Sequence, residues 1–104
     1  MMQGDQYLLP IELTTEDGEI LDPSYLDELE VFVGSVRKTL RNKEIEFDSG
    51  HGAYMVNLLQ KDTFMLRGTV LVQARLLFKN SGDVIGVDLG THTITESRSK
   101  VVLE

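Results

Sequence analysis

The stretch TVLVQARLLFKNSGDVIGVDL, residues 69–89, decides the fold. Apolar side chains occupy every second position in its first half and again after the break at residues 80–83. This alternation is typical of strands that bury one face, and the break consists of the turn residues Asn, Ser, Gly and Asp. We therefore predict a long strand over residues 69–79, a turn, and a further strand around residues 85–89.

The same alternation predicts four strands upstream. They cover residues 7–13, 29–36, 44–48 and 54–58. Pro10 lacks the N–H group that a central strand needs, so the first of them is expected at a sheet edge. A seventh strand near residues 93–95 is an alternative, and residues 97–104 are either a tail or a late strand. The one helical turn that we predict follows Asp22, which caps it before Pro23.

Six or seven short strands with turn signals about every ten residues are typical of an antiparallel immunoglobulin-like β-sandwich. We rank this all-β fold above a small barrel. The length of 104 residues suits a single domain spanning residues 1–104, because a chain of this size buries one core.

The segment LLQKDTF, residues 58–64, lies between the fourth strand and the long one. In an immunoglobulin-like sandwich the chain crosses there from one sheet to the other. We expect Asp62 and Thr63 to bond backbone N–H groups that the corner leaves unpaired, and Phe64 and Leu66 to plug the end of the core. A catalytic Asp62 is the weaker alternative.

Composition excludes several classes of protein. The absence of cysteine rules out disulfides, thiolate zinc sites and cysteine nucleophiles. No apolar run approaches the roughly 20 residues of a membrane span. The first residues lack the basic and then apolar layout of a signal peptide, so we expect the mature chain to begin near Met1.

The net charge of -7 is unevenly distributed, because residues 1–36 hold nine acidic side chains and no basic one. An acidic chain is a poor ligand for nucleic acid or anionic lipid. Four of the ten bases form one small cluster: Arg37, Lys38, Arg41 and Lys43. We predict a solvated hairpin tip, with contact to the acidic segment of another copy as the alternative.

Catalytic and metal-binding patterns are missing. His51 and His92 stand 41 positions apart. The acidic turn of Glu16, Asp17, Glu19 and Asp22 lacks the spacing of a calcium loop, so weak calcium binding is only an alternative to a surface turn. There is no Gly-x-Ser-x-Gly motif and no phosphate-binding glycine loop. Two carboxylates could serve a glycosidase, but the chain has no Trp to stack a sugar. We predict no enzymatic activity, no cofactor and no metal.

One side of the long strand is more apolar than solubility requires. If residues 70, 72, 74, 76 and 78 face inward, then Leu71, Arg75 and Leu77 face outward, as does Phe32 on its own strand. Scattered exposed apolar residues are normal, and a loop or the tail could cover them. A contiguous patch would instead mark a protein partner.

Four segments together resemble one protein family: YLLPIELTTEDGEILD (7–22), LEVFVGSVRKT (29–39), LLQKDTFMLRGTVLVQARLLFKNSGDVIGVDLG (58–90) and ESRSKVVL (96–103). The distinctive residues are Asp17-Gly18, Gly34, Gln60 with Asp62-Thr63-Phe64, Gln73 with Arg75, and Ser97-Arg98-Ser99-Lys100. The chain is similar to small proteins encoded in the tail and baseplate region of phages and prophages of Gram-positive bacteria. That resemblance implies a virion structural component with an immunoglobulin-like fold, similar to accessory domains of upper-baseplate proteins, and no established activity.

We therefore expect a non-enzymatic tail or baseplate protein that acts by protein–protein assembly. Its partners would be other tail or baseplate proteins, with homo-oligomers expected, and it would move from the bacterial cytoplasm into the virion tail. The expected contact residues are Phe32, Leu71, Arg75 and Leu77, with Arg37, Lys38 and Arg41 pairing acids of the neighbour. The alternative is a carbohydrate- or host-surface-binding module, for which Tyr25 and Tyr54 are the only candidate aromatics, and Tyr54 is expected in the core.

Overall fold

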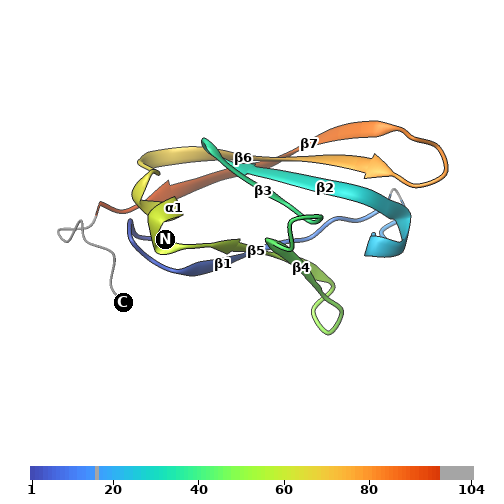
Figure 1. Cartoon of the computed structure of the whole chain (residues 1–104), viewed down its shortest axis with the longest axis horizontal. Coiled ribbons are helices and arrows are strands. Elements are labelled where there is room, and N and C mark those ends of the chain that lie inside the picture. Colours follow the sequence, from blue (N-terminus) through green and yellow to red (C-terminus); the bar gives the residue numbers. More distant parts are fainter. Residues whose placement is uncertain (16, 97–104) are drawn as a thin grey trace.

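The computed structural model describes residues 1–15 and 17–96, and these form two antiparallel sheets packed face to face (Figure 1). The three-stranded sheet has the order β1 (Tyr7–Ile11), β5 (Ala53–Leu58), β4 (Ile45–Asp48). The four-stranded sheet has the order β3 (Val36–Thr39), β2 (Leu26–Val33), β6 (Gly68–Phe78), β7 (Val84–Ile94). The predicted antiparallel all-β sandwich of six or seven strands is thus confirmed, with seven strands among the described residues.

The core lies between the sheets and is built by the predicted alternation. Its fully buried side chains come from both layers, among them Leu9 on β1, Tyr54 and Val56 on β5, Val31 on β2 and Val72 on β6. β1 pairs with β5 alone, so the edge position predicted from its proline is correct. A 3₁₀ turn, η1 (Pro23–Tyr25), follows the predicted cap, where the Asp22 carboxylate accepts the N–H of Ser24 at 2.9 Å.

Two strand predictions are wrong. Residues 29–36 do not form one strand, because the chain reverses between β2 and β3 through a two-residue turn in which Gly34 has a φ of 57°. That left-handed conformation suits a tight hairpin and is strained for other residues. Conversely, the predicted strands at residues 85–89 and 93–95 are one strand, β7, with an irregularity opposite Leu71 and Gln73. The prediction for residues 97–104 lies outside the described residues.

The corner between β5 and β6 does cross from one sheet to the other, as predicted, through the short helix α1 (Gln60–Phe64) (Figure 1). The Asp62 carboxylate accepts the N–H of Leu59 at 2.8 Å, which confirms its expected role. The prediction for Thr63 is wrong, because its buried hydroxyl donates to the carbonyls of Asp5 and Gln60 instead of accepting from an N–H. Leu66 is buried, and half-buried Phe64 packs on Gly4.

Candidate interaction surfaces

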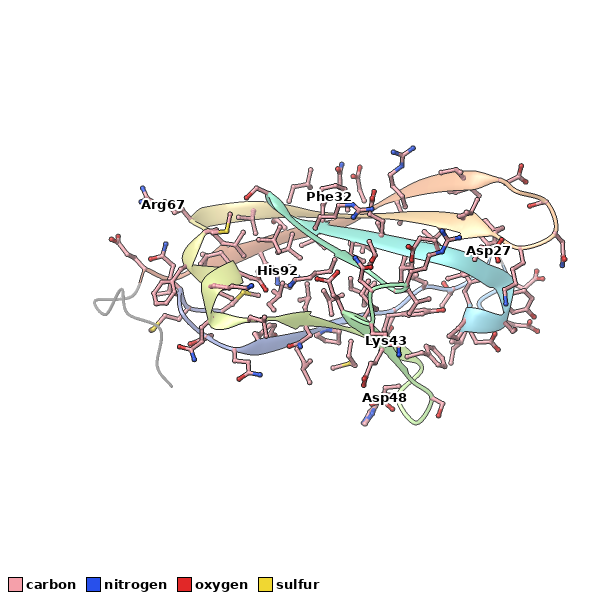
Figure 2. All side chains as sticks on the ribbon, in the orientation of Figure 1. Asp27, Phe32, Lys43, Asp48, Arg67 and His92 are labelled. Carbon is pink, nitrogen blue, oxygen red and sulfur yellow. The ribbon has the colours of Figure 1, made fainter. Side chains whose placement is uncertain are left out.

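The outer face of the four-stranded sheet carries the predicted contact residues. On β6 the odd-numbered side chains of Leu71, Arg75 and Leu77 point away from the core, while the even-numbered ones are buried or half-buried. Phe32 on β2 shares this face (Figure 2). The predicted inward and outward assignment of β6 is therefore correct.

The apolar part of this face is not continuous. Phe32 lies opposite Gln73, which makes it a diagonal neighbour of Leu71, a side chain that is 47% exposed. Two polar positions of β6, Gln73 and Arg75, then separate Leu71 from Leu77. The face thus offers two small apolar areas with a charged row between them. In that row Arg75 stands between Glu30 on β2 and Gly86 on β7.

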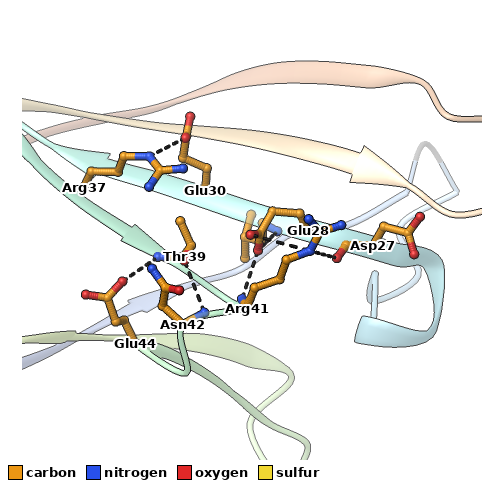
Figure 3. A network of polar contacts seen from close by, with 9 residues as sticks. Asp27, Glu28, Glu30, Arg37, Thr39, Arg41, Asn42 and Glu44 are labelled. Atoms are coloured by element: carbon orange, nitrogen blue, oxygen red, sulfur yellow. Dashed lines mark hydrogen bonds and ion pairs between the residues drawn. The ribbon is translucent and has the colours of Figure 1, made fainter.

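The basic cluster is not a single hairpin tip, because Arg37 and Lys38 lie within β3, although Arg41 and Lys43 do lie in the exposed turn that follows it. Arg37 lies in the middle of β3, and its Nε donates to Glu30 at 2.5 Å (Figure 3). Arg41 lies in the turn after β3, where its backbone N–H donates to Glu28 at 3.0 Å and its Nε donates to the carbonyl of Asp27 at 3.3 Å. These two arginines already have partners within the chain, although the Arg37 side chain is 52% exposed.

Lys38 contradicts its predicted role as a surface contact, because its side chain is only 7% exposed. Its Nζ lies 2.7 Å from the Asp62 Oδ2 atom and 3.5 Å from the Glu44 Oε2 atom. A buried ammonium without such partners would be strongly destabilising. The lysine therefore joins β3 of the larger sheet to α1 and to the residue before β4, and it closes this side of the sandwich.

The opposite side of the sandwich, between β1 and β7, remains open. A groove of about 440 Å³ lies there. Its walls are mainly apolar. Leu13 and Leu21 come from the segment that follows β1, and the other wall comes from β6 and β7: Leu76, Phe78, Ile85, Val87 and Leu89. One of its lining residues, Ile85, is 49% exposed. No sequence pattern indicated this groove, because the alternation does not say which strands are neighbours.

The outer face of the three-stranded sheet has a second hollow, of about 860 Å³. Its lining mixes apolar side chains such as Leu8 and Met55 with Glu46, Asp48 and Asn57. Of the two tyrosines considered for sugar binding, Tyr25 is exposed and lies elsewhere, in η1, whereas Tyr54 is in the core as expected. The hollow thus has polar groups that could bind hydroxyls, and its two aromatic side chains, Tyr7 and Phe47, are half-buried.

The titratable groups do not converge on a reactive centre. The His51 Nδ1 atom lies 2.7 Å from the Asp48 Oδ2 atom on an exposed turn, and this hydrogen bond lowers the pKa of Asp48. His92 lies far along the chain on β7, near the groove side of the sandwich (Figure 2). Burial, together with the charge of Asp22, raises the pKa of Tyr54 to about 12. Among residues 1–15 and 17–96, no three His, Asp or Glu side chains are placed to hold a metal ion.

The predicted acidic turn is present as a turn. The N–H of Thr15 donates to the carbonyl of Glu19 at 2.8 Å, and Gly18 has a φ of 82°. Glu16, one of its four carboxylates, lies outside the described residues.

No known protein family, curated protein or solved structure was found to match the chain. Within the described part, no helix has the length and apolar character to cross a membrane.

Proposed function

We propose that this chain is a non-enzymatic structural protein of a phage tail or baseplate and that it acts by protein–protein assembly. The exposed apolar side chains of one hairpin, β6 and β7, are the observation that favours this function. On the outer face Leu71 and Val84 are about half exposed at opposite ends of the strand pair, Val84 being the neighbour of Leu77, and Ile85 is about half exposed on the groove side. Neighbouring apolar side chains on the outer face, such as Leu77 and Val84, are typical of a surface that a partner covers.

Two further features support assembly. In the described residues every buried side-chain nitrogen or oxygen has a hydrogen-bond partner, so no buried polar group is held ready for a ligand. The resemblance of the sequence to tail and baseplate-region proteins points the same way. Under this proposal the chain is made in the bacterial cytoplasm and ends in the virion tail, with other tail proteins as its partners.

Tails purified from the source bacterium after prophage induction test this function. Mass spectrometry should find the chain among the stoichiometric tail components. Purified tails that lack the chain would contradict the proposal.

The contact face can be tested separately. Leu71→Asp and Leu77→Asp should leave the cooperative thermal transition in place, because both side chains point away from the core. Both should abolish association with the partner. Arg67→Asp is a matched control, since it is an exposed position just before β6. Loss of the fold in either leucine variant would show that the residue is needed for the core.

A carbohydrate- or host-surface-binding module is the second candidate. The hollow on the three-stranded sheet favours it, because Glu46 and Asn57 there could accept and donate hydrogen bonds to sugar hydroxyls. Titration with cell-wall polysaccharide should then show saturable binding that Asn57→Ala weakens. Hydrolysis of the same polymer by the purified protein would instead indicate an enzyme.

A further inference from the structure

Three of the four edge strands have features that hinder pairing with another chain. β1 contains Pro10, and β3 and β4 are four residues long and carry charges. Such features protect sheet edges from unwanted association. β7 is eleven residues long, has no Pro, Lys or Arg, and has one acidic residue, Asp88. It is therefore the one edge among the described strands that is open to a further strand.

Nothing within the isolated chain requires a glycine at position 86 of β7. Its φ is not in the left-handed region, and a Cβ atom added there would meet nothing within 4 Å. Its neighbour across the strand pair is Arg75, an exposed side chain with no ion pair among residues 1–15 and 17–96. An empty position thus lies between an unpaired arginine and the free edge of the sheet.

We propose that a second copy of this chain pairs with β7 in antiparallel orientation, centred on Val87, so that Arg75 reaches across Gly86 to the partner's Asp88. This inference rests on the proposed assembly function and adds a second copy of the chain as a partner at the β7 edge, apart from the contact face that Leu71 and Leu77 test. In this register Ile85 lies opposite the partner's Leu89, and Gly86 lies opposite the partner's Asp88. A register centred on Asp88 would place two carboxylates face to face, which disfavours it.

The geometry suits the ion pair. Arg75 and the partner's Asp88 would lie two strand spacings apart, about 9.6 Å between backbones, with only the bare glycine between them. The combined reach of an arginine and an aspartate side chain covers most of that gap. Because a twofold axis repeats every contact, the pair forms twice. Gln73, which already donates to Asp88 at 2.7 Å, fixes the orientation of the carboxylate.

The same pairing would cover the open groove. Ile85, Val87 and Leu89 lie on the inner side of β7 and line the groove wall. In the dimer the partner's Val87 and its apolar neighbours extend this row at the mouth of the groove. Strand addition of this kind combines backbone hydrogen bonds with side-chain contacts on alternate positions.

Single-cysteine variants test the register directly, because the chain has no cysteine of its own. Val87→Cys should form a disulfide-linked dimer under mild oxidation, since residues opposite each other have Cα atoms about 5 Å apart. Ile85→Cys and Leu89→Cys should each crosslink poorly alone but efficiently when mixed. Equal crosslinking of all three variants, or none by Val87→Cys, would overturn the register.

A charge exchange tests the ion pair. Arg75→Asp and Asp88→Arg should each weaken dimerisation about tenfold, since each disrupts two exposed pairs. The double variant should recover most of the affinity, and failure to recover would contradict the Arg75 contact. A chain that is monomeric but present in purified tails would refute this dimer and leave the proposed function standing. A chain that forms this dimer but is absent from purified tails would refute the proposed function and leave the dimer standing.

Discussion

Replacing Lys38 with methionine should destabilise the protein far more than a surface charge change does. The lysine ammonium lies between the carboxylates of Asp62 and Glu44, and the side chains of Lys38 and Asp62 are only 7% and 11% exposed. Methionine has a similar length and can fill the same space, so the change removes the charge with little loss of packing. What remains is a nearly buried carboxylate without its cation.

The size of the effect follows from that unpaired charge. Removing one partner of a buried ion pair typically costs about 3–5 kcal/mol, whereas an exposed pair contributes about 0–1 kcal/mol. Since Glu44 is partly exposed, we expect about 3 kcal/mol for Lys38→Met. Adding Asp62→Asn should recover part of the loss, because the amide oxygen can still accept the N–H of Leu59.

Urea denaturation at neutral pH measures this difference, provided that the m value is unchanged. Arg37→Met is the matched control, since Arg37 is the preceding residue on β3 and its ion pair with Glu30 is exposed. Its free energy of unfolding should change by less than about 1 kcal/mol. A Lys38→Met variant as stable as the Arg37→Met control would refute the inferred role of the buried lysine.

Three further changes probe the core and its turns. Tyr54→Phe should cost about 1 kcal/mol, because the Tyr54 hydroxyl donates to the carbonyl of Leu21 at 2.6 Å. The folded pKa of Tyr54 of about 12 exceeds its ordinary 10.0, so the native protein should lose stability as pH rises from 10 to 12, by up to about 2.7 kcal/mol, and the phenylalanine variant should lose less. Gly34→Ala should destabilise more than Gly82→Ala: both have positive φ, but only at Gly34 would the added Cβ press on a core side chain, at 3.1 Å. Thr63→Val should cost about 1–2 kcal/mol, since it leaves two carbonyls without the donor that now reaches them. Thermal or urea unfolding measures each change, and equal losses for the two glycine variants would contradict the steric argument.

The alternation of apolar residues made the sandwich predictable, since it reports which face of each strand is buried. The same rule could have found the missed hairpin. Val31 and Val33 both point inward, and the next inward residue is Val36, three positions further on. An interval of three breaks the period of two and indicates a reversal at Gly34, whereas the predicted strand over residues 29–36 runs straight through this glycine.

The site was less predictable, because it depends on contacts between distant residues. The partner of Lys38 is Asp62, 24 positions away, so the local sequence showed only a basic cluster. The open edge of β7 depends on the order of strands in the sheet. The outward positions predicted for Leu71 and Arg75 are correct, since that assignment requires only knowing whether the odd or the even positions of one strand face the core.

The molar mass in solution tests the central claim most directly. Light scattering after size exclusion, over a range of protein concentration and at low and high salt, should show twice the 11.7 kDa of one chain as concentration rises. A single mass of 11.7 kDa under every condition would contradict assembly through a second copy.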